Sequence, residues 1–163
     1  MRQEVPVKKI TKKNFNEYGD VITTKNIKPR INEDVFTFWN NLATMRPEGN
    51  IDFALLEVVK RENNYRTMER HTTTKEAYMA LDEDVVLFVS LTKNEKPDFE
   101  TVKAFHLEAG KGVVLNRNTW HWLPYPLADS AHLLVLNKKE TLEDDLEKID
   151  IKKQFDKSFK LDF

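Results

Sequence analysis

The feature that most constrains the fold is a series of short β-like segments between residues 51 and 138. Most segments are rich in apolar residues, the segment at 65–71 alternates in part, and polar residues separate each segment from the next. Many short strands at intervals of roughly 8–12 residues are typical of a β-sandwich or barrel, not of βαβ units. The chain is therefore predicted to be mainly β. The expected strands are 51–59, 65–71, 76–81, 85–91, 102–107, 113–115, 120–123 and 132–136.

Helical patterns occur toward the two ends of the chain. Thr11 is a suitable N-cap for a short helix ending near Tyr18, and Thr141 precedes an amphipathic segment that reaches Ile149. Residues 32–43 fit neither a helix nor a strand clearly. We predict a single domain over residues 1–163, with a barrel core at about 51–138. An N-terminal strand and helix within 1–50 and a C-terminal helix within 139–163 are expected to pack outside it.

Composition narrows the chemistry that this domain can perform. The chain has no Cys, which excludes disulfides and thiol nucleophiles and leaves His, Asp and Glu as metal ligands. Its formal net charge of −1 gives no general attraction for nucleic acid, and no apolar run approaches the roughly 18 residues of a membrane span. Its four Gly are too scattered for a dinucleotide or P-loop motif. A cytoplasmic protein without nucleic-acid or membrane partners is expected.

Two local patterns contain candidate metal ligands. Glu69 and His71 are two residues apart, so a strand over 65–71 would direct both side chains to one face, and Glu76 opens the next strand. In the second pattern, Gly110 precedes His121 by eleven residues. Strand alternation would turn His121 away from the tryptophans on either side of it, as a ligand that points into a pocket requires.

Together these patterns resemble the two motifs of the cupin barrel. The first would be read as Glu69-x-His71, four residues, then Glu76. The second would place Gly110, Asn116, Asn118 and His121 at the cupin offsets, with Asn in place of the usual Pro and second Gly. Asn accepts the left-handed backbone conformations that such a Gly often adopts.

Within the cupins, the sequence resembles the ureidoglycolate lyase family. Residues 15–22 resemble the family's FxxYGDVI opening, Glu69-Arg70-His71 its ERH segment, and residues 112–121 its most recognisable block. The resemblance extends over roughly residues 14–136. It implies a cupin-type double-stranded β-helix, or jelly-roll barrel, that forms a homodimer. The implied activity is cleavage of (S)-ureidoglycolate to glyoxylate and urea in allantoin (purine) catabolism.

The resemblance also implies roles for the residues in the motifs. A divalent metal ion would be held by His71, Glu76 and His121, with Glu69 as a fourth ligand or as a base; Glu69 and Glu76 are the candidate catalytic carboxylates. Nickel, zinc and manganese all accept His and carboxylate ligands. Arg117, Asn118 and Arg70 are the candidate substrate-binding residues, because a guanidinium pairs with a carboxylate through two hydrogen bonds.

Two departures from the family pattern keep other functions open. Asn116 and Trp122 stand where the family usually has histidines. One alternative is another metal-dependent cupin lyase or isomerase that acts on a small hydroxy, keto or sugar acid. The other alternative is a non-catalytic cupin that binds a small ligand. The remaining histidines, His106 and His132, are expected to be structural.

Overall fold

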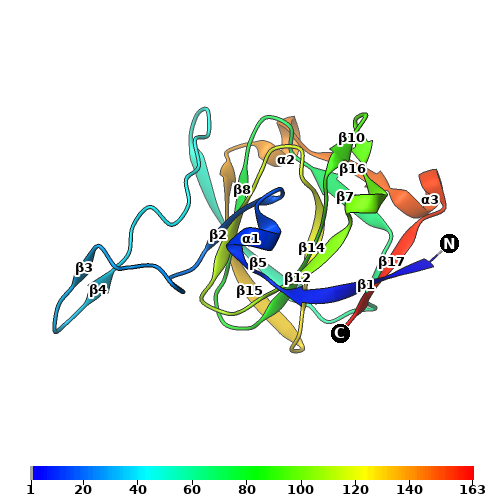
Figure 1. Cartoon of the computed structure of the whole chain (residues 1–163). Coiled ribbons are helices and arrows are strands. Elements are labelled where there is room, and N and C mark those ends of the chain that lie inside the picture. The colour runs from blue at the N-terminus through cyan, green and yellow to red at the C-terminus, as the bar shows by residue number, and fades with distance from the viewer. Residues whose placement is uncertain (1) are drawn as a thin grey trace.

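The computed structural model describes residues 2–163, and its core is a barrel of eight strands (Figure 1). One sheet has the order β7-β14-β9-β12 and the other β13-β8-β15-β5, and every pairing within these two sets is antiparallel. This is the double Greek-key order of a jelly roll. The mainly-β, cupin-type barrel expected from the sequence is confirmed. The eight strands are β5 (Ile51–Val59), β7 (Thr67–Arg70), β8 (Glu76–Ala80), β9 (Val85–Ser90), β12 (Lys103–Leu107), β13 (Gly112–Leu115), β14 (Trp120–Pro126) and β15 (Ser130–Lys138).

Further strands extend both sheets. The first sheet becomes eight-stranded through β16 (Glu147–Asp150), β1 (Arg2–Lys9), β17 (Ser158–Asp162) and β6 (Asn64–Tyr65), and the second gains β2 (Gly19–Ile22). β1 lies parallel to both β12 and β17, so the first and last strands of the chain are neighbours. The shorter elements outside the sheets are β3 (Ile31–Asn32), β4 (Thr37–Phe38), β10 (Thr92–Lys93), β11 (Lys96–Pro97) and η1 (Phe99–Thr101).

The helices are shorter than predicted. α1 (Lys12–Phe15) begins after Thr11, whose side chain and that of Asn14 form a capping box. The single C-terminal helix expected within 139–163 is wrong, because that segment forms α2 (Thr141–Asp144), β16, α3 (Ile151–Phe155) and β17. By pairing with β7, β16 gains hydrogen-bond partners for its backbone N–H and C=O groups. In β17, the side chains of Phe159 and Leu161 are buried. Tertiary packing has overridden the local helical pattern.

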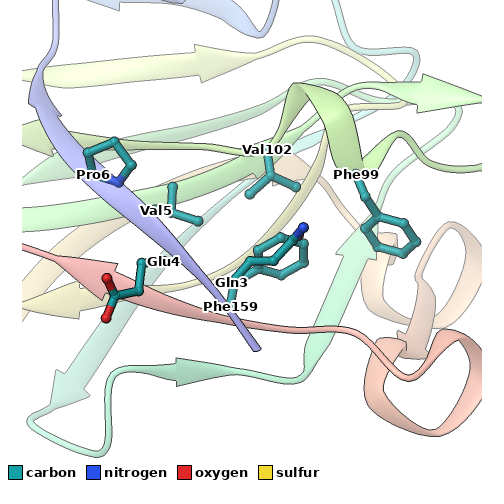
Figure 2. Close-up of a pocket in the computed structure, with 7 residues that line it drawn as sticks. All are labelled: Gln3, Glu4, Val5, Pro6, Phe99, Val102 and Phe159. Atoms are coloured by element: carbon teal, nitrogen blue, oxygen red, sulfur yellow. The ribbon is translucent and has the colours of Figure 1, made fainter. Parts of the chain in front are cut away.

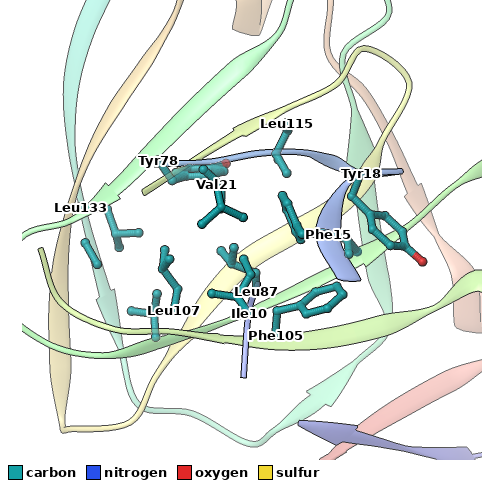
Figure 3. Close-up of a cluster of buried hydrophobic side chains, with 14 of the residues drawn as sticks. Ile10, Phe15, Tyr18, Val21, Tyr78, Leu87, Phe105, Leu107, Leu115 and Leu133 are labelled. Carbon is teal, nitrogen blue, oxygen red and sulfur yellow. The ribbon is translucent and has the colours of Figure 1, made fainter. Parts of the chain in front are cut away.

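The hydrophobic core consists of two clusters on the two faces of the eight-stranded sheet. The first fills the barrel interior between the sheets, where Phe15, Tyr18 and Phe105 pack ring against ring at centroid distances of 5.2–5.8 Å (Figure 3). The second lies on the other face and includes Phe88 and Trp120. All six residues of β9 are buried, as its continuous apolar sequence predicts.

One extension leaves the barrel between β2 and β5. Its hairpin of β3 and β4 projects away from the rest of the molecule in Figure 1. Ile31, Val35, Phe36 and Phe38 of this segment are exposed. Over residues 2–163, the helices are all too short or too polar to cross a membrane.

Candidate metal centre

The candidate site lies where three strands meet at one end of the barrel. His71 directly follows the last residue of β7, Glu76 is the first residue of β8, and His121 is the second residue of β14. β7 and β14 belong to one sheet and β8 to the other, so the site is built between the two sheets. The fold thus brings together three predicted ligands that are far apart in the sequence.

The three side chains form one buried cluster. One ligand atom from each of His71, Glu76 and His121 can be chosen so that all lie within 4.8 Å of one another. Nε2 of His121 is 3.1 Å, and Nε2 of His71 is 3.7 Å, from Oε2 of Glu76. All three residues are at most 6% exposed. Burying two imidazoles and a carboxylate together is costly unless a positive charge is shared among them.

The outer nitrogens of both imidazoles are fixed by backbone carbonyls. Nδ1 of His71 donates to the carbonyl oxygen of Asp145 at 2.9 Å, and Nδ1 of His121 donates to that of Thr119 at 3.0 Å. Because a carbonyl can only accept, both Nδ1 atoms carry the proton, and in the neutral ring Nε2 presents its lone pair to the cluster. This outer hydrogen bond is the usual support of a metal-binding histidine.

Glu76 is held in place from its own sheet. The hydroxyl of Tyr78, two residues along β8, donates to its Oε2 at 2.5 Å, and Nδ2 of Asn137 donates to its Oε1 at 3.3 Å. Burial alone would raise the pKa of the Glu76 carboxyl, but the adjacent imidazoles of His121 and His71 hold that pKa well below its usual range. Burial lowers the pKa of His71, but the nearby Glu76 carboxylate, together with the carbonyl of Asp145, outweighs burial and raises the pKa. The cluster therefore attracts positive charge.

A divalent metal ion fits these residues. Among the described residues, Nε2 of His121 is a buried polar atom with no hydrogen-bond partner, although it faces Glu76. A cation would engage this atom together with Nε2 of His71 and the Glu76 carboxylate. Two imidazoles and one carboxylate suit Ni, Zn, Mn or Fe and leave coordination positions for a substrate. Metal binding requires neutral imidazoles, so it would compete with protonation of His71.

Glu69 lies beside this cluster. It is directly opposite His121 in the β7–β14 ladder, and its Oε1 is 3.8 Å from Nε2 of His121. Burial raises the pKa of the Glu69 carboxyl, and the nearby charge of Glu76 raises it further, against the opposing effect of His121. The two acidic side chains thus differ: Glu76 is held ionised, whereas Glu69 is closer to accepting a proton.

The three candidate substrate-binding residues have different surroundings. Arg70 points away from the cluster: its guanidinium is over the ring of Trp120 and bonds to Glu147 and Glu95 at 2.6 and 2.7 Å. Arg117 and Asn118 lie in the exposed turn between β13 and β14. No residue between 2 and 163 forms an ion pair with Arg117. The backbone N–H of Asn118 donates to the carbonyl of His71 at 2.8 Å, which ties this turn to the site.

Asp145 is a residue that the sequence did not point to. Its carboxylate accepts hydrogen bonds from Thr72, Thr73 and Thr74 while its carbonyl accepts from His71. Burial raises the pKa of Asp145, but the threonine hydrogen bonds outweigh burial and lower it to about 2. Asp145 is 74 residues from His71 in the sequence, and no local sequence pattern indicates that the two are in contact. The role of Tyr78 could have been found, since it is two residues from Glu76 on the same strand face.

The other histidines and the surface pockets lie elsewhere. His106 and His132 form pairs with Asp84 and Asp82, each at 2.6 Å. Figure 2 shows an open pocket over β1, η1 and β17, where Phe99 and Phe159 contribute rings and Glu4 the acidic group. None of the proposed metal ligands lines this pocket. The His71–Glu76–His121 cluster is therefore separate from this pocket.

The chain is similar to curated proteins, to solved structures and to one family profile. Curated ureidoglycolate lyases of Escherichia coli O1:K1 and Shigella boydii serotype 18 are each 28% identical over 122 residues, which is 66% of this chain and 70% of theirs. Solved structures of Bacillus subtilis oxalate decarboxylase, one of them a study of its Mn(II) centres, match with a TM-score of 0.43 and 16% identity. They cover 63% of this chain, which spans only 24% of theirs. The family profile described as ureidoglycolate lyase matches residues 2–157. The chain therefore belongs to the ureidoglycolate lyase family.

Proposed function

We propose that this protein is a metal-dependent lyase that cleaves (S)-ureidoglycolate to glyoxylate and urea, a step of allantoin and hence purine breakdown. Membership of the family supports the reaction. The observation that carries the proposal is the pair of buried imidazoles, both with Nδ1 bonded to a carbonyl and Nε2 directed at Glu76. This arrangement is suited to holding a cation and leaves room in its coordination for a small hydroxy acid.

The proposed cofactor is a divalent ion, with nickel, zinc and manganese as candidates. His71, Glu76 and His121 would hold it, and Glu69 is close enough to serve as a fourth ligand or as a base. When bound, the ion would act as a Lewis acid toward the hydroxyl and carboxylate oxygens of the substrate. Glu76, whose pKa is held low, stays ionised and suits the role of ligand.

Glu69 is the proposed proton carrier. Burial raises the pKa of its carboxyl group above the usual value, which brings the group closer to accepting a proton from the substrate. The hydroxyl proton of ureidoglycolate passes to Glu69 as the carbon–oxygen bond becomes the carbonyl of glyoxylate. The carbon–nitrogen bond breaks, its electron pair stays on the urea nitrogen, and Glu69 returns the proton there. The reaction is balanced without water or an oxidant.

The substrate carboxylate is proposed to be oriented from the turn between β13 and β14. Arg117 is exposed there, so its guanidinium is available to pair with a carboxylate through two hydrogen bonds. Asn118 adds an amide beside it, on a turn bonded to His71. Arg70 is not part of this proposal, because Glu95 and Glu147 already bind its guanidinium.

The test compares metal content and glyoxylate release in matched variants. The wild type, stripped and then reloaded with Ni²⁺, Zn²⁺ or Mn²⁺, is expected to release glyoxylate from racemic ureidoglycolate. His71→Ala plus His121→Ala should lose both metal and activity. His106→Ala plus His132→Ala removes the same number of histidines outside the site and should retain both. Equal metal content in the two double variants would contradict the metal site.

Glu69→Gln separates binding from catalysis. A base contributes roughly 10²- to 10⁴-fold to a rate, so turnover should fall by about that factor while the three proposed ligands still bind metal. A metal-loaded wild type that releases no glyoxylate would contradict the lyase function. Metal binding without that activity would instead favour a cupin that acts on, or binds, another small acid.

The functional unit is proposed to be a homodimer in the cytoplasm. Support for the dimer comes from exposed apolar side chains on β5, where Phe53 and Leu55 are 68% and 74% exposed, and on the projecting hairpin of β3 and β4. A two-stranded hairpin is marginally stable alone, so these surfaces call for a partner. In a dimer with a two-fold axis, the β3–β4 hairpin of each copy, here called the arm, would pack on β5 of the other copy, and both surfaces would be covered.

A further inference from the structure

Asp145 has an unusual number of hydrogen bonds for one side chain. It lies between α2 and β16 and is 7% exposed. Its Oδ1 accepts from the backbone N–H and the hydroxyl of Thr72, both at 2.8 Å. Its Oδ2 accepts from the N–H and hydroxyl of Thr73, at 2.9 and 2.8 Å, and from the N–H of Thr74 at 3.0 Å. Three consecutive backbone N–H groups thus converge on one carboxylate.

These bonds hold the segment that joins two proposed metal ligands. Residues 71–75 lie between β7 and β8 and belong to neither strand, so no sheet hydrogen bonds fix them. His71 begins this segment and Glu76 directly follows it. The carboxylate of Asp145 therefore sets the path of the chain between the two ligands. Its backbone carbonyl also accepts from Nδ1 of His71 at 2.9 Å and orients that ring.

The segment that contains Asp145 is itself anchored along β7. β16 begins two residues later and pairs with β7 in the register Glu147↔Arg70 and Lys148↔Glu69. The side chain of Glu147 also bonds to Arg70 at 2.6 Å. The C-terminal part of the chain is therefore bound, through β16 and Glu147, to the end of β7 that precedes His71.

We propose that Asp145 is a positioning residue for the metal centre, which fixes the orientation of His71 and its spacing from Glu76. This inference rests on the proposed metal site and extends it to the C-terminal segment, to which the site residues themselves do not belong. Outer-sphere partners of this kind typically change metal affinity by about 10- to 100-fold when they are altered. A merely stabilising role would leave the affinity of the folded protein unchanged.

Asp145→Asn is the direct test, because it keeps the shape and the backbone carbonyl but places an amide N–H₂ against N–H donors. The matched control is Asp150→Asn. Asp150 is on the same segment and its carboxylate accepts from the backbone N–H of Lys153 at 2.8 Å, at the start of α3 and away from residues 71–76. Both variants weaken the hydrogen bonds of a carboxylate to backbone N–H groups, but only Asp145→Asn weakens the hold on Thr72, Thr73 and Thr74, which join His71 to Glu76.

The probe is Co²⁺ alone, titrated into metal-free protein and followed by its visible absorption bands and by calorimetry. Asp145→Asn should bind Co²⁺ about 10- to 100-fold more weakly than the wild type and with altered bands, whereas Asp150→Asn should match the wild type. Folding of each variant is checked by its thermal transition. If Asp145→Asn does not fold, Thr73→Val removes one hydroxyl donor at nearly constant volume and should weaken binding by a smaller factor.

The outcomes separate this inference from the proposed function. Folded Asp145→Asn, or in its place Thr73→Val, with the affinity and spectrum of the wild type would contradict the role of Asp145 and leave the metal site standing. A wild type that binds no Co²⁺ would contradict the metal site and, with it, the positioning role. Weaker binding in Asp150→Asn equal to that in Asp145→Asn would show a general loss of stability and would also contradict the inference.

Discussion

Asn118 combines two demands in one residue. Its φ of 64° is in the left-handed region, where side chains that branch at Cβ are strongly disfavoured. Its backbone N–H bonds to the carbonyl of His71, so the turn must keep this conformation to reach the site. The cupin resemblance places a Gly here, and Asn is the side chain that best tolerates the same conformation.

Substitution of Asn118 should therefore separate backbone strain from side-chain chemistry. In metal-free protein, Asn118→Gly should change the free energy of unfolding by less than about 0.5 kcal/mol, whereas Asn118→Val should lower it by roughly 1–3 kcal/mol. Urea unfolding measures both values. Arg117→Val is the control, because Arg117 is next to Asn118 and is also exposed but has a negative φ. Equal stability of the two Val variants would contradict the strain.

Single residues of the site differed in how far the sequence could predict them. His71, Glu76 and His121 could be proposed together because their spacing follows strand periodicity and a known motif. Asp145 could not, since its relation to His71 depends on how a segment 74 residues away docks on β7. The surroundings of Arg70 were equally hidden, because Glu147 and Glu95 reach it from distant elements.

Among the secondary-structure elements, the sequence predicted the strands of the barrel core well but not the strand that pairs at the edge of a sheet. The core strands β5, β8 and β9 coincide with their predicted ranges to within one residue, because each is a short apolar segment bounded by polar residues. The C-terminal segment was expected to be a helix. Its strand β16 is decided by the unpaired edge of β7, and no local pattern of apolar residues reports the presence of such an edge.

The turn between β8 and β9 carries a prediction about pH. Nδ1 of His132 lies 2.6 Å from Oδ2 of Asp82, and both side chains are about half exposed. The hydrogen bond and charge of Asp82 raise the pKa of His132 above 6.5, so the stabilisation is complete below about pH 6.5 and is lost as pH rises through the raised pKa. The pKa of Asp82 is lowered, chiefly by the backbone N–H of His132, so its contribution is present above about pH 4.

Asp82→Asn should therefore cost more stability at pH 5.5 than at pH 9. Urea unfolding of the wild type and the variant at both pH values gives the two differences, and the pair of His106 with Asp84 cancels because both proteins contain it. A smaller difference should persist at pH 9, since Asp82 also accepts from the backbone N–H of His132. Equal differences at the two pH values would show that the pair does not titrate as described.

For the whole molecule, the balance of buried and exposed apolar surface points to a second copy. The barrel buries its interior thoroughly, yet β5 is an edge strand whose outward side chains Phe53 and Leu55 are exposed. An exposed apolar edge strand is an aggregation hazard that stable proteins cover. Val35, on the projecting arm between β3 and β4, is 88% exposed, so the same chain also supplies an apolar surface to cover it.

The proposed dimer should therefore dissociate when either surface is made polar. Leu55→Lys and Val35→Lys each place a charge in the expected contact, and light scattering after size-exclusion chromatography should show monomers where the wild type shows dimers. Leu142→Lys is the control, because Leu142 is 67% exposed on α2, outside both surfaces. A monomeric wild type, or dimers in both Lys variants, would contradict the exchange of arms. Since the metal ligands all come from one barrel, the monomeric variants should still bind metal, which separates assembly from the site.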